Sequence, residues 1–417
     1  MTHPRWILRS AALGLAPVIV GLSAAREGRP RCDPDNGGLV LPEGFCATVM
    51  ASNLGPVRQL AVAPNGDLYA ALSGEPGDGS GGVLAFRDLN RDGKPDQRAS
   101  FGPRGGNDVE VHQGHVYFAL NDRIVRYRLS GKLEPDGREE TLVADLPREG
   151  NHKAKSIAFG AGDTMYVAIG SATNSCQRTD RLPASPGHDP CKELERHAGV
   201  WQFSASRPGQ RFSDARRFAT GLRNAIAIGT QPGTHALFAA VHGRDQLSDN
   251  WGFSDTVNAD NPGEELVRIV AGDDFGWPYC YYSNQYQKKV LAPEYGGDGR
   301  KVGRCASAKN PLIAFPGHWA PMAIAYYPGD QFGERYQGGL FIAFHGSWNR
   351  APLPQAGYRV SFLPFAQGQP AGEYFTFATD KSGPTALRAS GVAVAPDGSL
   401  YISADQNGKI WKVTKQR

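Results

Sequence analysis

Two short motifs carry side chains that could do chemistry. His152 lies in Asn151–Lys153, and a histidine with an ordinary pKa of ~6–7 can act as a general base near neutral pH. Arg223 and Asn224 place a guanidinium beside an amide, a pair that suits a ligand with carbonyl or carboxylate groups. Taken alone, the two motifs leave a plainer interpretation open, in which His152 is a surface histidine and Arg223 caps a loop.

A third motif, VHGRD at Val241–Asp245, could hold a metal ion. Gly243 frees the backbone, so that its carbonyl and that of Arg244 can turn toward one point, and Ca²⁺ accepts such oxygens. Because this uses only the main chain, truncating Arg244 to alanine should leave the metal bound. Three further polar residues lie in corresponding loops: His345, Arg350 and Arg388.

The stretch Asp88–Asp96 (DLNRDGKPD) has oxygen-bearing side chains at alternating positions. With Gly93 at the sixth position, it resembles a Ca²⁺-binding loop. The twelfth position holds Ala99 instead of the expected glutamate. A second Ca²⁺ site and a metal-free polar turn therefore both stay open.

The motifs flank a repeated pattern of an apolar alternation, a tight polar turn and a second apolar run, which is typical of a β-hairpin. Six copies occur, and the first three begin about 50 residues apart, close to the length of one propeller blade. The sequence predicts an all-β fold, a six-bladed β-propeller with loop insertions; a large β-sandwich or two all-β domains is the alternative. The copies begin at Gln59, Asn107, Ser156, Ala225, Ala323 and Gly391.

In a propeller, loops at one end of the central channel converge, so the motifs above should meet there. The ring should close where the segment 45–52 pairs with 409–413 in the last blade.

Two arginines precede an apolar run at 11–22, and small residues follow up to Ala25. This layout predicts a signal peptide at 1–25 and a propeller domain at 26–417, hence a periplasmic or secreted protein with no stable membrane anchor. The formal net charge of +4 is small, and no Lys/Arg cluster is interleaved with aromatic residues. Nucleic acid is therefore not predicted as a partner.

An even number of cysteines after a signal peptide favours disulfides. The chain has six cysteines, and their order alone does not determine the connectivity. The absence of C-x-x-C disfavours a zinc site, and the absence of C-x-x-C-H excludes a covalently attached c-type haem. Pairing of neighbours in sequence is predicted, because each pair encloses one turn-rich loop: Cys32–Cys46, Cys176–Cys191 and Cys280–Cys305.

These motifs occur in an order that resembles the glucose/sorbosone dehydrogenase family, and the likeness runs from about residue 41 to the C-terminus. GDDFGWPYCYY and FHGSWNR are the more specific stretches and look closest to the sorbosone dehydrogenase branch. The resemblance implies a soluble six-bladed quinoprotein that oxidises an aldose or related sugar with pyrroloquinoline quinone (PQQ) and Ca²⁺. The matching stretches are 151–170, 221–228, 241–245, 265–282, 338–350 and 387–413.

The resemblance also implies roles for two catalytic residues. His152 matches the base that takes the proton from the hydroxyl of the carbon being oxidised, while hydride passes to the C5 carbonyl carbon of the quinone. Arg223 matches the arginine at the quinone oxygens, where a cation stabilises developing negative charge. The electrons would pass on to an acceptor such as a cytochrome or a quinone.

By the same resemblance, Asn224 contacts the cofactor and Arg388 pairs with a PQQ carboxylate. Gly243 and Arg244 match the two residues whose carbonyl oxygens hold Ca²⁺. Two more residues are placed in the cofactor pocket by motif position only: His345 and Arg350.

The chain departs from the glucose-oxidising branch at several positions. Ser171 and Asn151 stand where that branch has aspartates, and Ser390 replaces a second arginine. The lysine of the fifth blade's loop is not matched either. These changes leave open what orients His152 and how tightly the cofactor is bound.

Two functions from other classes stay open. A Ca²⁺-dependent six-bladed lactonase or esterase would polarise a carbonyl with its metal, held by inward carboxylates and asparagines. A non-catalytic secreted propeller would serve as a binding module and would not need His152.

Overall fold

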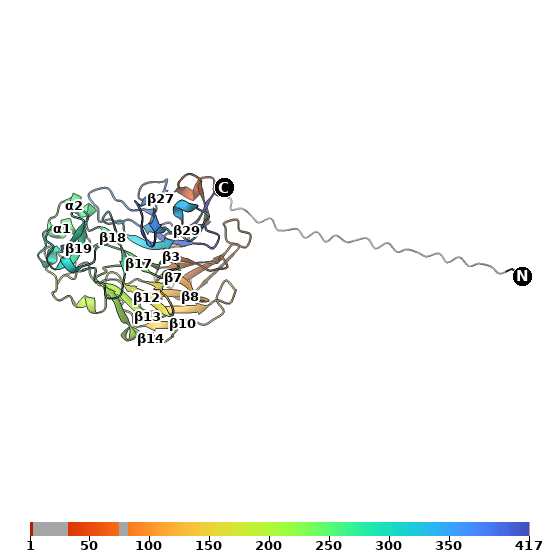
Figure 1. Cartoon of the computed structure of the whole chain (residues 1–417), viewed down its shortest axis with the longest axis horizontal. Coiled ribbons are helices and arrows are strands. Elements are labelled where there is room, and N and C mark those ends of the chain that lie inside the picture. Colours follow the sequence, from red (N-terminus) through yellow and green to blue (C-terminus); the bar gives the residue numbers. More distant parts are fainter. Residues whose placement is uncertain (3–31, 75–81, 417) are drawn as a thin grey trace.

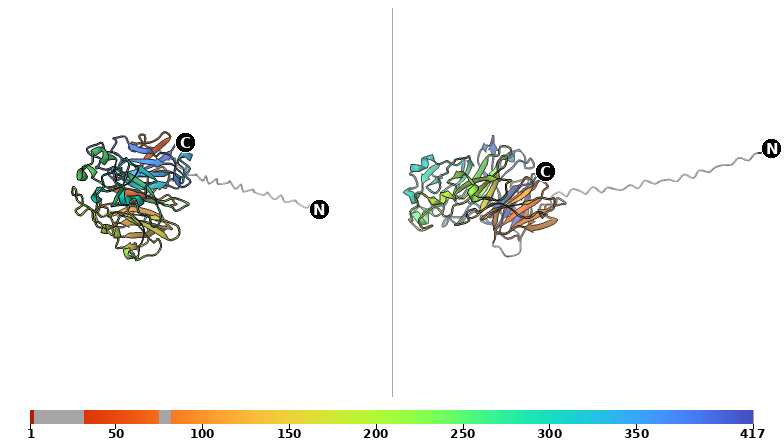
Figure 2. Two further views of the ribbon diagram at one scale, coloured as in Figure 1. Left: turned by 60° about the vertical axis from the view of Figure 1, so that its left-hand side comes forward. Right: turned by 90° about the horizontal axis from the view of Figure 1, so that it is seen from below.

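The computed structural model describes residues 1–2, 32–74 and 82–416. Six antiparallel sheets are arranged around a common centre, and helices are few and short (Figure 1, Figure 2). This is the predicted six-bladed β-propeller, and the sandwich alternative is wrong. The proposed signal peptide falls almost entirely outside the described residues.

All six predicted hairpins form the first two strands of a blade, as the strand order of each sheet shows. In the first half of the chain the blades are β3 (Val57–Val62), β4 (Leu68–Leu72), β5 (Val83–Arg87), β6 (Gln97–Phe101); β7 (Gly106–His112), β8 (His115–Leu120), β9 (Ile124–Arg128), β10 (Glu140–Ala144); and β11 (Lys155–Phe159), β12 (Thr164–Ile169), β13 (Gly199–Ser204), β15 (Arg216–Thr220). In the second half they are β16 (Ala227–Thr230), β17 (Leu237–Val241), β18 (Glu264–Ile269), β21 (Ile313–Phe315); β22 (Pro321–Tyr326), β23 (Leu340–Phe344), β24 (Arg359–Leu363), β27 (Phe375–Asp380); and β28 (Ala389–Val394), β29 (Leu400–Ala404), β30 (Lys409–Lys415), β2 (Phe45–Ala51).

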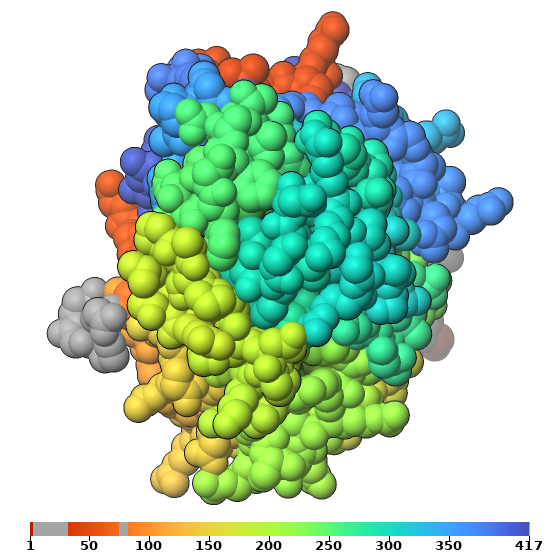
Figure 3. Space-filling model, turned by 90° about the vertical axis from the view of Figure 1, so that its left-hand side faces the viewer, coloured from red at the N-terminus to blue at the C-terminus, as the bar shows by residue number. Residues whose placement is uncertain are grey.

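The remaining elements lie in loops or at blade edges. Two insertions on either side of β18, one carrying α1 and α2 and the other β19 and β20, cover the middle of one face, where their atoms are green and teal in Figure 3. None of the helices in the described part of the chain is long and apolar enough to cross a bilayer. These elements are α1 (Leu247–Trp251), α2 (Asp255–Asp260), β1 (Leu39–Val40), β14 (Gln210–Arg211), β19 (Cys280–Ser283), β20 (Lys288–Leu291), β25 (Phe365–Ala366), β26 (Gln369–Pro370) and the 3₁₀ turns η1 (Asn36–Gly38), η2 (Lys192–Glu195), η3 (Phe212–Asp214), η4 (Pro293–Tyr295), η5 (Gly303–Ser307) and η6 (Glu334–Tyr336).

The hydrophobic core is divided among the interfaces between neighbouring blades. Each of six apolar clusters takes its side chains from two adjacent sheets. Alternate residues of a strand point to opposite faces of its sheet, so one strand can pack against both neighbouring blades. In β4, Ala70 belongs to the cluster with blade 6 and Tyr69 to the cluster with blade 2.

The ring closes between the two ends of the chain, as predicted. β2 pairs with β30 in antiparallel register, with Ala47 opposite Val413. The preceding strand β1 pairs with β27 of the fifth blade, a contact that the sequence did not predict. The N-terminal segment therefore ties blades 5 and 6 together.

The three predicted disulfides are present: Cys32–Cys46, Cys176–Cys191 and Cys280–Cys305.

The first strands of the six blades form a closed ring around the channel, each in contact with the next. They all run in the same direction, because every blade repeats the same strand order. We call the end where these strands begin the loop mouth; it also receives the connections between second and third strands. The opposite end, where the tight turns of the hairpins lie, is the hairpin mouth.

Candidate functional site

His152 lies in the connection that enters β11, at the loop mouth. Its Nδ1 is 2.9 Å from the carbonyl oxygen of Ser171 and 3.0 Å from the Ser171 hydroxyl. That hydroxyl donates its own proton to the carbonyl of Thr173 at 2.6 Å, so toward His152 it acts as an acceptor. Nδ1 must therefore carry the ring proton, which leaves Nε2 with a free lone pair. Ser171 thus orients the histidine where the glucose-oxidising branch has an aspartate.

The surroundings of His152 keep it neutral. Burial lowers its pKa to about 3, and the charge of Arg223 adds to this shift. The expectation of an ordinary histidine pKa is therefore wrong for this site. Gly170 permits the close packing here, because a Cβ at that position would lie 2.5 Å from Cβ of His152 and 3.1 Å from Oδ1 of Asn224.

Arg223 is 4% exposed and has its guanidinium fixed on several sides. Nη1 donates to the carbonyl of Gly243 at 2.7 Å, and Nη2 lies 3.1 Å from Oδ2 of Asp245. Burial lowers the pKa of Arg223, yet an arginine stays protonated at any physiological pH. Burial acts to raise the pKa of Asp245, but the charges of Arg223, His318 and Arg181 outweigh it and the pKa is lowered. The pair is therefore ionised.

Asn174 is a residue of this site that the sequence analysis missed. Its Oδ1 accepts from Arg223 Nη2 at 2.9 Å and from the backbone N–H of Asp245 at 2.9 Å, while its Nδ2 donates to the Asp245 carbonyl at 3.0 Å. Its own carbonyl accepts from Arg223 Nε at 3.0 Å and from the indole N–H of Trp277 at 3.1 Å. Asn174 thus fixes the arginine relative to the VHGRD loop. No motif marks it in the sequence, because its partners lie far away in the chain.

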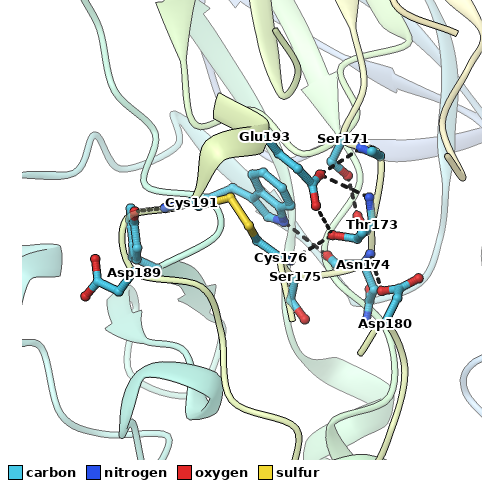
Figure 4. The surroundings of a disulfide bond; sticks show 12 residues. Ser171, Thr173, Asn174, Ser175, Cys176, Asp180, Asp189, Cys191 and Glu193 are labelled. Atoms are coloured by element: carbon cyan, nitrogen blue, oxygen red, sulfur yellow. Dashed lines mark hydrogen bonds between the residues drawn. A yellow bond between two sulfur atoms is a disulfide. The ribbon is translucent and has the colours of Figure 1, made fainter. Parts of the chain in front are cut away.

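The loop that carries Ser171 and Asn174 is held by a disulfide and a carboxylate (Figure 4). Cys176–Cys191 closes it, and Glu193 accepts hydrogen bonds from the N–H groups of residues 172 and 173 at 2.9 and 3.1 Å. Figure 4 shows Glu193 pointing toward this turn. The acceptors for His152 and Arg223 therefore come from one cross-linked loop.

Of the two VHGRD carbonyls predicted to bind a metal ion, one is already hydrogen-bonded and one is free among the described residues. The Gly243 carbonyl already accepts from Arg223, whereas the Arg244 carbonyl accepts no hydrogen bond within the ranges that the structure describes. The Arg244 side chain turns away and its Nη1 lies 2.5 and 2.6 Å from the two Glu294 oxygens, in a fully buried pair. Truncating Arg244 would remove the counter-charge of a buried carboxylate, so the alanine substitution should also cost stability, whatever its effect on the metal.

Glu264 lies directly beside this loop. It accepts from the Gly243 N–H at 2.9 Å and from the Ala320 N–H at 3.0 Å. Burial raises its pKa to about 8. Oxygen atoms of carboxyl and main-chain carbonyl groups are the donors that Ca²⁺ prefers, and this loop and Glu264 supply both kinds.

His345 and Arg388 are brought together in a second cluster at the same mouth. The Arg388 Nε lies 3.1 Å from His345 Nε2, which is also 3.0 Å from each Asp405 oxygen. Arg58 Nη1 donates to Asp405 at 2.6 Å. Arg58 and His345 thus share one carboxylate, and Arg388 contacts the imidazole; two guanidinium groups beside one carboxylate suit an anionic ligand.

Arg58 and Asp405 were missed, although the sequence holds a usable signal for both. Arg58 lies just before the Gln59 hairpin pattern, as Arg388 lies before the last one. Asp405 directly follows the second strand of its blade, the place that His345 occupies in blade 5. Applying one positional rule to all six blades would have found both.

Asn224 and Arg350 differ in whether their side chains are hydrogen-bonded within the protein. The Asn224 side chain is 8% exposed and forms no hydrogen bond with any described residue. The Arg350 guanidinium donates to the carbonyls of Ala259, Gly317 and Pro354, which fastens its loop to the end of α2. Arg350 makes no hydrogen bond to the His345 cluster in the described part of the chain.

The Asp88–Asp96 loop is closed on itself. Asp88 accepts from the N–H groups of Asp92 and Gly93 at 3.2 and 2.9 Å, and Asp96 accepts from the Leu89 N–H at 2.6 Å. These bonds account for the turn without a metal ion.

Fold and site together define a six-bladed propeller with a neutral histidine, a buried arginine and a cationic cluster at one mouth of its channel. The family model for TrAA12-like proteins matches residues 39–416. The chain belongs to the TrAA12-like family.

Similar proteins have been described in fungi and bacteria. A pyrroloquinoline quinone-dependent pyranose dehydrogenase of Coprinopsis cinerea is 26% identical over 238 residues, covering 47% of this chain and 31% of that protein. An uncharacterized protein of Borreliella burgdorferi is 29% identical over 201 residues, covering 47% of this chain and 48% of that protein. The chain thus matches less than half the length of these curated relatives.

Solved structures share the fold. The calcium structure of a Trichoderma reesei enzyme of carbohydrate-active family AA12 aligns with a TM-score of 0.74 and 18% identity, covering 91% of this chain and 97% of that one. The holo PQQ domain of the Coprinopsis cinerea pyranose dehydrogenase aligns with a TM-score of 0.73 and 16% identity, covering 93% and 98%. At these identities the alignments establish the propeller fold alone.

Proposed function

We propose that this protein is a PQQ- and Ca²⁺-dependent sugar dehydrogenase. The observation that carries the proposal is the tautomer of His152, since Ser171 holds Nδ1–H and leaves Nε2 as a base at the loop mouth. Membership of the TrAA12-like family and the PQQ-dependent relative support the choice of reaction.

In the proposed reaction, a C–H and an O–H bond of the sugar are broken. His152 Nε2 accepts the hydroxyl proton, so the oxygen can form a second bond to its carbon as hydride leaves. When bound, PQQ would supply the carbonyl carbon that accepts the hydride, which carries both electrons. Arg223 stabilises negative charge that develops on an oxygen beside it, and Asn174 keeps the guanidinium in place for that purpose.

The residues present fit the cofactor. Arg388, Arg58 and His345 would hold its carboxylates, and the unpartnered amide of Asn224 would contact its ring system. The free carbonyl of Arg244 together with that of Gly243 would bind Ca²⁺. Arg350 would act on this pocket through its loop and not by contact.

Substrate, acceptor and location belong to the same proposal. The substrate is an aldose or related sugar, and the sorbosone-type branch is the finer assignment. A cytochrome or a quinone takes the electrons. The signal peptide predicted from the sequence and the three disulfides support export to the periplasm or beyond the cell.

The lactonase alternative is less well supported. It needs several inward carboxylates that are free to bind the metal. At this mouth Asp245 and Asp405 are both paired with arginines, whereas Glu264 is held by backbone N–H groups.

The test is reconstitution with PQQ and Ca²⁺, followed by dye reduction with a panel of aldoses. His152→Ala should retain bound cofactor, seen in its visible spectrum, and lose turnover, while His115→Ala at the hairpin mouth should behave as wild type. Metal-dependent lactone hydrolysis without PQQ would instead select the lactonase. Absence of cofactor binding and of sugar oxidation in the wild type would overturn the proposal.

A further inference from the structure

The hairpin mouth contains a cavity that is separate from the candidate site. Its volume is about 410 Å³, and the first strands of all six blades line it. Gln59 crosses the channel above it, where Nε2 lies 3.1 Å from the Ser156 hydroxyl and 3.0 Å from the carbonyls of Ile226 and Met322. One amide from blade 1 thereby bridges to blades 3, 4 and 5 and divides the channel.

The cavity lining combines polar and apolar surface. Its apolar residues include branched aliphatic side chains from five of the six first strands and the ring of one tyrosine. They are Leu60, Val111, Ile228, Ile324, Val392 and Tyr326.

Two acidic residues of β7 face the same side of that strand, because they are two positions apart. The Glu110 carboxyl borders the cavity and forms no hydrogen bond or ion pair with any described residue. Asp108 is 1% exposed; its Oδ2 accepts from the Ile157 N–H at 2.7 Å, and its Oδ1 has no partner. Burial raises the pKa of both groups, and the charge of Asp108 adds to the shift at Glu110.

His112 continues the same face of β7 at the cavity. Its ring stacks on Phe159 with centroids 4.0 Å apart and planes 3° apart, and its Nε2 is buried without a hydrogen-bond partner. Burial lowers its pKa, so the ring is neutral. Two carboxyl groups and a neutral imidazole thus line one strand face, and no lysine or arginine pairs with them among residues 32–74 and 82–416.

We propose that the hairpin-mouth cavity binds a small organic cation, a protonated primary amine with an apolar body. An ammonium group has three N–H donors and a charge that would satisfy the Glu110 carboxyl at the cavity, and the buried Asp108 two positions earlier would add negative potential there. The branched walls would take up the apolar body, and the volume is far larger than a single metal ion needs. Burying an ionised carboxylate without a cationic or hydrogen-bonding partner costs folding free energy.

Calorimetry on the purified full chain without PQQ tests this site independently of the dehydrogenase function. The probes are phenethylammonium, the neutral alcohol of the same shape, and Ca²⁺ alone. The amine should bind with one-to-one stoichiometry and at least about tenfold more tightly than the alcohol, because only the amine forms a charge-assisted hydrogen bond.

Variants locate the binding. Glu110→Gln should weaken amine binding at least about tenfold, whereas Glu134→Gln on an exposed turn should leave it unchanged. Equal affinity of the wild type for amine and alcohol would overturn the proposal. So would wild-type amine affinity in Glu110→Gln. So would Ca²⁺ binding that depends on Glu110 while the amine fails to bind. The comparison of probes on the wild type holds even if a variant does not fold.

Discussion

The two mouths of the channel treat buried charge in opposite ways. At the loop mouth, Arg223 pairs with Asp245 and Arg58 pairs with Asp405, while the carboxyl of Glu264 accepts from two backbone N–H groups. At the hairpin mouth, Glu110 has no partner among the described residues. The difference arises because long connections can bring partners from distant parts of the chain, whereas a strand presents only its own alternate side chains.

The contrast also explains how the candidate site is preorganised. Charges at the loop mouth are held in place before any ligand arrives, which is the condition for electrostatic stabilisation of a developing charge. Charges at the hairpin mouth await a partner, which is the condition for a binding site. Four perturbations should act on this contrast with decreasing effect.

Removing the base should have the largest effect. His152→Ala should lower turnover of the reconstituted enzyme by about 10²–10⁴-fold, the usual cost of losing a general base. Because the pKa of His152 is lowered to about 3, the ring is already neutral above that pH, so wild-type turnover should not rise between pH 6 and 7. Stopped-flow measurements across pH check both points. A wild-type rise with a midpoint near 6.5 would show that the base is more exposed than described.

Removing the side chain that positions Arg223 should lower turnover less than removing the base. Asn174→Ala removes acceptors from Arg223 and from the Asp245 N–H, so turnover should fall about 10- to 100-fold, with a smaller change in KM. Asn174→Asp keeps an acceptor but places an oxygen against the Asp245 carbonyl, so it should not restore full activity. Wild-type turnover in Asn174→Ala would exclude a positioning role.

The disulfides should differ in what they protect. Replacing Cys176 and Cys191 together with serine should lower the free energy of unfolding by about 3 kcal/mol and also reduce turnover, since that loop carries Ser171 and Asn174. Replacing Cys32 and Cys46, which enclose a loop of similar length, should cost similar stability and leave turnover of the remaining folded protein unchanged. Chemical denaturation with parallel assays separates the two effects.

Neutralising one carboxyl at each mouth should shift stability in opposite directions. Burial acts to raise the pKa of Asp405, but contacts with His345, Arg58 and Arg388 outweigh burial and lower it. The ionised Asp405 therefore stabilises the fold above its unfolded pKa, and this stabilisation is lost as pH falls. Asp405→Asn should lower the free energy of unfolding at pH 7 by about 1–3 kcal/mol. The pKa of Glu110 is raised, so the wild type loses stability as pH rises above the unfolded value. Glu110→Gln should therefore stabilise at pH 8 by at least about 1 kcal/mol and have little effect at pH 4. Denaturant titrations at both pH values measure this.

The sequence by itself determined the repeat and its local consequences. Period-2 alternation around polar turns identified all six hairpins, and the order of segments along the chain predicted the closure of blade 6. The three disulfides were predicted by pairing cysteines that are neighbours in sequence and enclose one turn-rich loop. These features depend on residues that are near in sequence or on a rule that applies once per blade, so pattern alone was sufficient. The motifs around His152, Arg223 and His345 were predicted to meet at one end of the channel for the same reason, and they lie at the loop mouth.

The tertiary structure decided which atoms meet there. Asn174 reaches Arg223 from 49 positions away, and Arg58 reaches Asp405 from 347 positions away. Burial then set the ionisation of His152 and Glu110, a property of their surroundings that residue type does not encode. The side chain of Arg244 likewise turned to Glu294 because a buried cation requires a partner. Local pattern specified the scaffold, and long-range packing specified the charge states on it.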